Sequence, residues 1–299
     1  MLAKSSNSKP ALDRTGQSMA VELCLLRGFE LTCAGKVVHV SSSGQRVLAF
    51  LALHPRPLPR SYVAEVLWVE STGERAGANL RSTLWRLKKP GLRLIDRAGD
   101  CLRLAEHVIV DVHETEARAR RVLDPDYFGD ERDAVELTNS GELLPAWYED
   151  WVLIERERQR QLLLHALESL CERFTRRRSF GPAIAAGIAA VQGEPLRETA
   201  HRALIQAYVA EGNLGEAIRQ YHTCKRLLQE QLGLEPSTDL TESVRKLFQR
   251  QAPIQEWAEP PRHSGVRQPD LSSARLPADR RAQSAAGVSP SSRLLRAGQ

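Results

Sequence analysis

Residues 74–89 read ERAGANLRSTLWRLKK, and this stretch decides the fold of the first part of the chain. Its leucines, Leu80, Leu84 and Leu87, recur at helical spacing, whereas basic side chains occupy many of the other positions. At 3.6 residues per turn one stripe of such a helix is apolar and the rest is cationic. The apolar stripe packs on a small core, and the other side faces either phosphate or solvent alone. The flanking sequence has to decide between these two interpretations.

The flanking segments place this basic helix third in a series of three. Residues 21–40 alternate or run apolar between turn signals, which predicts two or three short strands. Two further helices are predicted within residues 41–55 and 59–68, and a hairpin follows over residues 92–104. Strands, three helices and a hairpin in this order predict a winged helix-turn-helix, with the third helix in the major groove and the hairpin as the wing.

The charge is unevenly distributed along the chain. The whole sequence carries a formal net charge of +5 and has a pI near 9.1. Residues 20–105 hold 13 basic and 7 acidic side chains, whereas residues 106–252 hold 19 basic and 25 acidic ones. A polyanion is therefore expected to bind the N-terminal part, with an affinity that falls steeply as salt rises.

No motif for catalysis or for a bound cofactor stands out. The 5 cysteines form no CxxC pair, and the sequence lacks GxxxxGK, HExxH, GxSxG and GxGxxG patterns. We therefore expect no enzyme activity, no metal and no cofactor. The sequence also lacks an apolar run of about 20 residues and a signal-peptide core, so a membrane partner is not expected, and the cytoplasm, at the nucleoid, is the expected location.

Residues 107–251 are predicted to form an all-α domain. Asp111 is expected to begin its first helix as an N-terminal cap, with Glu114 three residues later. Further along, similar residues recur at an offset of 34, the tetratricopeptide period. The matched pairs are Leu170 with Leu204, Phe174 with Tyr208, Phe180 with Leu214, Gly181 with Gly215, Ala183 with Ala217 and Ile184 with Ile218. Gly187 departs from the pattern, because an aromatic residue is usual at its position.

Four large aromatic residues allow two interpretations each. Trp147, Tyr148 and Trp151 precede a long charged helix, and we favour core packing between helices over an exposed ligand site. Trp85, on the basic helix, could contact a DNA sugar. The interpretation preferred from the sequence is that it packs against the wing or a neighbouring domain.

Several stretches resemble the SARP family of pathway activators from antibiotic-producing actinobacteria. They are QRVLAFLALHP, AEVLW, ANLRSTLWRLKK, LLPAWYEDWVLIERER, GEPLRETAHRALIQAYVAEGNLGEAIRQY and LGLEPS, and their order extends over roughly residues 20–250. The resemblance implies an OmpR-type winged helix followed by a bacterial transcriptional activation domain. It further implies binding of two protomers to direct repeats in promoters and recruitment of RNA polymerase, which OmpR-type relatives contact through the loop at residues 69–73.

The DNA-binding candidates lie on the third helix and the wing. They are Arg75, Asn79, Arg81, Ser82, Arg86, Lys88 and Lys89 near the third helix, and Arg93, Arg97 and Arg103 on the wing. Arg and Asn side chains can hydrogen-bond base edges, and any of the cations can neutralise phosphate. An ordinary solvated arginine remains the alternative at each wing position.

The sequence thus predicts a mainly α protein in four segments. Residues 1–19 are a disordered N-terminus, 20–106 a winged helix with a small sheet and a wing, 107–251 a tetratricopeptide-like activation domain, and 252–299 a disordered tail. The predicted function is sequence-specific activation of an antibiotic biosynthetic gene cluster from double-stranded promoter DNA. A repressor or effector-sensing DNA-binding regulator, and a protein-interaction scaffold, are the alternatives.

Overall fold

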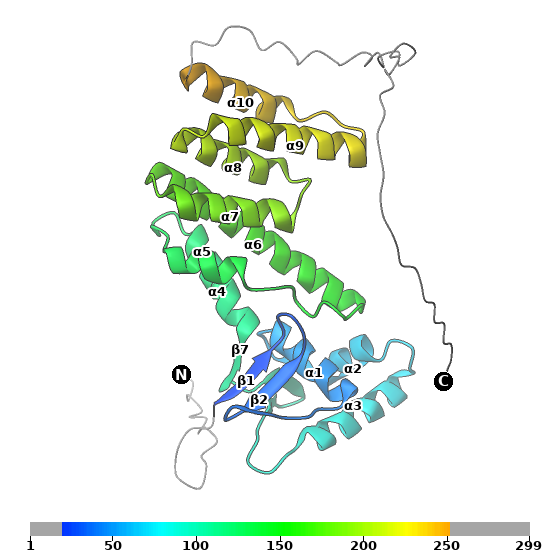
Figure 1. Cartoon of the computed structure of the whole chain (residues 1–299). Coiled ribbons are helices and arrows are strands. Elements are labelled where there is room, and N and C mark those ends of the chain that lie inside the picture. The colour runs from blue at the N-terminus through cyan, green and yellow to red at the C-terminus, as the bar shows by residue number, and fades with distance from the viewer. Residues whose placement is uncertain (1–19, 252–299) are drawn as a thin grey trace, which may run out of the picture. The chain divides into compact units, whose positions relative to one another are not determined.

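The computed structural model describes residues 20–251 of the 299-residue chain (Figure 1). Both segments that were predicted to be disordered, residues 1–19 and 252–299, lie outside the described residues. The described part is a winged helix with small sheets followed by an all-α domain, so the predicted fold class is confirmed.

The first sheet has the strand order β3-β2-β1-β7. Its strands are β1 (Val21–Cys24), β2 (Glu30–Cys33), β3 (Lys36–Val37) and β7 (Val108–Val110). In β1, Val21 and Leu23 are buried while Glu22 is exposed, as expected for a strand with one face on a core. Strands β1 and β2 are antiparallel, but β1 and β7 are parallel, with Leu23 opposite Val110. Strand β7 has three residues, too few to show a period in the sequence.

Three helices follow the strands as predicted. They are α1 (Ser42–Leu53), α2 (Arg60–Leu67) and α3 (Gly73–Leu87), and their apolar faces share one core with the first sheet. Helix α1 comes close to the end of α3 at Gly44. A Cβ atom at this position would lie 2.6 Å from Val40 Cγ1 and 3.0 Å from Leu87 Cδ2. The missing side chain of Gly44 therefore lets α3 pack against α1.

The predicted hairpin is a three-stranded wing. Strands β5 (Ile95–Ala98) and β6 (Cys101–Leu104) are antiparallel, and β4 (Leu58–Pro59) pairs with the other side of β6. Gly99 occupies the turn with a φ of 61°, a conformation that glycine adopts without strain. The wing is thus tied through β4 to the residues just before α2.

The rest of the described chain is helical. Its helices are α4 (Asp111–Leu123), α5 (Glu131–Thr138), α6 (Asp150–Arg176), α7 (Phe180–Gly193), α8 (Glu198–Glu211), α9 (Leu214–Leu232) and α10 (Thr238–Gln251). From α6 to α9 each helix packs on the next, and α10 packs on α8 (Figure 1). None of the helices between residues 20 and 251 is both long and apolar enough to span a bilayer.

The end of β1 is held by two segments that are distant from it in the sequence. Asp111 accepts backbone hydrogen bonds from Leu25 at 2.9 Å and from Leu26 at 3.0 Å. Leu26 and Leu143 form an isolated β-bridge, and the Leu144 N–H donates to the Leu25 carbonyl at 2.9 Å. Asp111 does begin α4 as predicted, but its carboxylate holds β1 and makes no capping bond to the N–H of the third residue of its own helix.

The aromatic cluster after α5 is only partly as predicted. Trp147 stacks on Phe29 with ring centroids 6.3 Å apart, and Trp151 meets Phe50 edge-on at 5.2 Å. Both tryptophans therefore pack on the winged-helix core. Tyr148 is 77% exposed, so the core-packing interpretation is wrong for this ring. It could not be separated from its neighbours by residue type, because all three are large aromatics.

A buried carboxylate joins α4 to α5. Asp133 is almost fully buried and accepts hydrogen bonds from Arg118 at 3.2 Å, from Arg121 at 2.9 Å and from the Tyr127 hydroxyl. Burial alone would raise the pKa of Asp133, but the hydrogen bonds from Tyr127, Arg121 and Arg118 outweigh it and hold the pKa below its usual value. Asp133 thus stays ionised at neutral pH and fixes α5 beside α4.

Gly187 is a close-approach position in the middle of α7. A Cβ atom there would lie 3.1 Å from Cys171 Sγ on α6 and 3.1 Å from Leu204 Cβ on α8. The Leu204 Cβ is attached to the backbone and cannot rotate away, so glycine lets three helices pack tightly. This explains why an aromatic residue does not occupy position 187. Leu170 and Leu204, which the 34-residue offset pairs, are both buried, although the tetratricopeptide assignment itself stays a prediction.

His201 is a fully buried titratable group on α8. One ring nitrogen, Nε2, lies 2.9 Å from the Pro195 carbonyl, and the other, Nδ1, lies 2.7 Å from Gln220 Nε2. This pairing suits the neutral ring, which donates to Pro195 and accepts from Gln220. Burial lowers the pKa of His201, and the hydrogen bond to Pro195 and the charge of Glu198 oppose this shift only in part.

Gly187→Val is expected to lower the free energy of unfolding by about 1–3 kcal/mol, because the added methyl groups overpack the space beside Leu204. Urea unfolding monitored by circular dichroism measures this change. Gly181→Val, on the same helix with nothing within 4 Å of its Cβ position, is the control. Equal stabilities of the two variants would contradict the close-approach role.

The buried His201 predicts an acid-sensitive stability. As pH falls, His201 in the unfolded chain binds a proton at its ordinary pKa of about 6.5, before the native ring does. The stability that neutral His201 contributes is therefore complete above that pH and is lost as pH falls toward the lower native pKa. Between pH 7.5 and 5.5, His201→Gln should lose less unfolding free energy than the wild type, by about 1 kcal/mol. His39→Gln, at an exposed position, should keep the wild-type pH dependence. Parallel pH profiles for wild type and His201→Gln would contradict this role.

Candidate nucleic-acid interface

Helix α3 presents one apolar and one polar side. Its buried residues are Ala76, Leu80, Thr83, Leu84 and Leu87. All the predicted contact residues near this helix are exposed: Arg75, Asn79, Arg81, Ser82 and Arg86 on α3, and Lys88 and Lys89 just beyond it. The structure therefore gathers the predicted residues of this segment on the solvent side of one helix and its C-terminal end.

Most cations of this segment have no acidic partner. Within the part of the chain that the structure describes, Arg75, Arg81, Arg86 and Lys88 form no ion pair with a carboxylate. Lys89 is also unpaired with acids, but its Nζ donates to the His39 carbonyl at 2.9 Å. These positive charges are free to bind an external anion such as phosphate.

The wing arginines differ from one another in their partners. Arg93 Nε lies 2.7 Å from the buried Asp96 carboxylate, and Arg103 contacts both Asp96 at 3.5 Å and Glu106 at 2.8 Å. Arg97, by contrast, is exposed and has no carboxylate within ion-pair distance among residues 20–251. Asp96 thus forms ion pairs with two of the three predicted wing residues, Arg93 and Arg103, and leaves Arg97 free.

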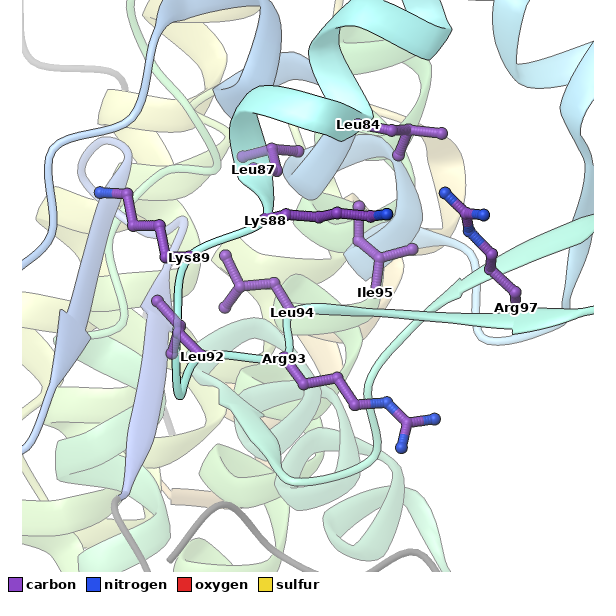
Figure 2. A pocket seen from close by; sticks show the side chains of 9 residues that line it. All are labelled: Leu84, Leu87, Lys88, Lys89, Leu92, Arg93, Leu94, Ile95 and Arg97. Carbon is purple, nitrogen blue, oxygen red and sulfur yellow. The ribbon is translucent and has the colours of Figure 1, made fainter. Parts of the chain in front are cut away.

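A hollow of about 260 Å³ lies between the end of α3 and the start of the wing. Leucine side chains, including Leu84 and Leu87, line it together with cationic residues. Figure 2 shows Lys88, Arg93 and Arg97 extending to one side of this hollow, while Lys89 extends to the other. Lys88, just beyond α3, and Arg97, on the wing strand β5, therefore lie on the same side of the hollow, although they come from different segments.

Trp85 lies on the exposed side of α3 and is absent from the predicted contact set. It is 75% exposed, so the preferred interpretation of packing against the wing or a neighbouring domain is wrong. A Trp ring flanked by Arg81 and Arg86 offers an apolar surface for sugars or for the thymine methyl group. Trp85 lies nearly opposite the leucine stripe of the helix, and this position was the sequence signal that could have placed it among the predicted contact residues.

The described residues carry little sign of catalytic chemistry. Among residues 20–251 no three His, Cys, Asp or Glu side chains are grouped as metal ligands. Burial raises the pKa of the Cys171 thiol to about 12 and that of Cys224 to about 11, so both stay protonated at neutral pH. Neither thiol is therefore an activated nucleophile.

Comparison with known proteins identifies the helical part. Residues 110–247 match the family model of the bacterial transcriptional activator domain. The regulatory protein AfsR of Streptomyces coelicolor is 26% identical over 234 residues, which are 74% of this chain. Residues 110–247 therefore carry a bacterial transcriptional activator domain, and the chain is similar to a Streptomyces regulatory protein over most of its length.

Coverage and a solved structure add two details to this comparison. The match spans only 24% of the length of AfsR. A solved structure of EmbR from Mycobacterium tuberculosis, in complex with a low-affinity phosphopeptide, matches with a TM-score of 0.62 and 21% identity, over 78% of this chain and 66% of that one. The EmbR likeness supports the fold, a winged helix followed by a helical domain.

Trp85→Ala is expected to change the free energy of unfolding by less than about 0.5 kcal/mol, because the ring is exposed and leaves no cavity when it is removed. Urea unfolding provides the measurement, and Trp151→Ala, which removes a ring packed on Phe50, is the matched comparison. The role of Trp85 as an external contact would be contradicted if the two variants were destabilised equally.

Proposed function

We propose that the protein is a sequence-specific transcriptional activator that binds double-stranded promoter DNA through α3 and the wing. The proposal rests on the exposed side of α3, where Arg75, Arg81 and Arg86 have no acidic partner among residues 20–251. Some exposed arginines of the helical domain, such as Arg219, instead lie beside a carboxylate, whereas others, such as Arg176, have none beside them in the described part of the chain. A helix with unpaired cations and a firmly packed leucine face fits the major groove as a recognition helix.

The proposed contacts follow from side-chain chemistry. Arg81, Arg86 and Asn79 can form two parallel hydrogen bonds with a base edge, and we assign base readout to them. The remaining candidates, Arg75, Ser82, Lys88, Lys89, Arg93, Arg97 and Arg103, are assigned to phosphate or sugar. Of the wing residues, Arg97 is the strongest phosphate candidate because it is not engaged by Asp96.

Recruitment of RNA polymerase is the second part of the proposal. A groove beside the loop after α2 is lined by Val69, Tyr148 and Ile154, all of which are largely exposed, and by the acidic residues Glu70 and Asp150. Exposed apolar residues within an acidic rim suit contact with a basic protein surface. In this proposal two protomers bind direct repeats in tandem, and their tetratricopeptide-like helical domains act as protein-binding scaffolds.

The resemblance to SARP activators supports a more specific role. We propose that the chain controls a secondary-metabolite, antibiotic-type gene cluster from the cytoplasm, at the nucleoid. Transcript levels after deletion of the gene distinguish activation from repression, since target transcripts fall if the protein activates and rise if it represses. A protein-interaction scaffold would instead show partners without any preference for DNA sequence.

Arg86→Ala is expected to weaken promoter binding about 5- to 150-fold, because loss of a base-edge contact costs about 1–3 kcal/mol. The operator comes from a map of genomic binding sites, and fluorescence anisotropy with operator and random duplexes gives the two affinities. Arg97→Ala should instead weaken binding to both duplexes and lower the salt slope by about 1.

Arg219→Ala is the control for both variants, because Arg219 is also an exposed arginine, on α9, but pairs with Glu216. We expect it to bind the operator like the wild type. A wild-type protein with no preference for operator over random DNA would overturn the proposed function. Equal effects of Arg86→Ala and Arg219→Ala would overturn the assignment of Arg86.

A further inference from the structure

A second hollow, of about 430 Å³, lies in the helical domain. The end of α5 with the loop that follows it, the middle of α6 and the end of α7 surround it. The buried side chains Leu137, Leu164 and Leu167 line it. This volume lies within the usual range of small-molecule sites, which are concave and mainly apolar with few polar groups.

One polar group in this hollow lacks a partner. Gln159, on α6, lines the hollow and is only 3% exposed. Its side-chain Nε2 has no hydrogen-bond partner among the described residues. A buried donor without an acceptor is costly, so native structures nearly always satisfy such groups. This nitrogen is itself closed to solvent, so a turn of the Gln159 amide toward the hollow would let an acceptor atom there satisfy it.

The charged side chains at the hollow are already occupied. Arg156 donates to the Leu143 carbonyl at 2.8 Å and lies 3.1 Å from Glu142. Arg160 pairs with Glu157 at 2.8 Å and with Glu194. With its cations neutralised in this way, the hollow favours an uncharged ligand over an anion.

The loop that forms one wall of the hollow also contacts the winged helix. The Arg27 N–H donates to the Glu142 carbonyl at 2.8 Å, and Leu26 bridges Leu143. A Cβ atom at Gly141 would lie 2.5 Å from Arg27 Cγ, so the loop backbone rests directly on that side chain. Any ligand that displaces this wall must also displace the chain at the end of β1.

We infer that this hollow is a binding site for a small uncharged organic molecule with an apolar body and one carbonyl or ether oxygen. The oxygen accepts the hydrogen bond of Gln159, and the apolar body covers the leucines. Binding is transmitted through residues 138–144 to Leu26 and Arg27 in the winged helix. The site itself is independent of DNA binding, whereas its use as a regulatory input rests on the proposed function.

Acetophenone and α-methylstyrene test the site, because they have the same shape. They differ in one group, which is a carbonyl oxygen in acetophenone and a methylene group in α-methylstyrene. The full chain, with labelled leucine methyl groups and amides, is titrated with each compound and followed by NMR. We expect saturable shifts at Leu163, Leu164 and Leu167, and binding of acetophenone about three- to tenfold tighter, as one hydrogen bond provides. The amides of Leu26 and Arg27 should shift along the same curve.

Three variants complete the test. Gln159→Leu should bind both compounds equally, whereas Gln192→Leu, the same change at the exposed mouth of the hollow, should keep the preference. Ala189→Phe should fill the hollow and abolish binding of both compounds.

Several outcomes would overturn the inference. Shifts that do not saturate, or that map to other leucines, would exclude the site. Equal wild-type affinities for the two compounds would remove the role of Gln159, and a bound water molecule would then account for its unpaired donor. Saturable binding without movement of the Leu26 and Arg27 amides would exclude transmission. None of these readouts uses DNA, so failure of promoter binding leaves this test intact.

Discussion

The hydrogen bonds from the Leu25 and Leu26 N–H groups to Asp111 are the contact on which the rest of the structure depends. They occur where the parallel strand β7 ends and α4 begins, so one carboxylate joins the first strand of the winged helix to the first helix of the next domain. The Leu26–Leu143 bridge then adds a second attachment to the same strand end. The apolar core of the winged helix consequently extends to residues far along the chain, including Leu144 and Val152.

The two parts of the chain use arginine differently. Several arginines of the helical domain lie beside acids, as Arg118 and Arg121 do around Asp133, and their charge holds helices together. On α3 the arginines face solvent and have no acidic partner in the part of the chain that the structure describes. The wing is intermediate, since Asp96 engages Arg93 and Arg103 and leaves Arg97 free. Net charge alone would not separate these roles, because it counts paired and unpaired arginines alike.

The helical domain combines very close packing with an open hollow. At Gly187 three helices approach so closely that even one added carbon would contact Leu204. Gln159, on the same long helix α6 that contributes Cys171 to this contact, instead lines the hollow, and its amide nitrogen has no hydrogen-bond partner among the described residues. Close-packed interiors transmit displacement rather than absorb it. A ligand in the hollow beside Gln159 would therefore displace the residues that form the walls of the hollow. One of those walls is the loop that holds β1.

The sequence by itself determined the elements whose signal is local. Helices α1 to α3 and the β5–β6 hairpin follow from apolar spacing and turn residues, and the leucine stripe of α3 separates its buried from its exposed side. Only the tertiary structure decided what depends on residues far apart in the chain. Asp96 engages two predicted wing contacts, Trp85 stays largely exposed among residues 20–251, and α6 and α8 leave room only for glycine at position 187. Periodicity records which side of one element is buried, but the partner that buries it comes from elsewhere in the fold.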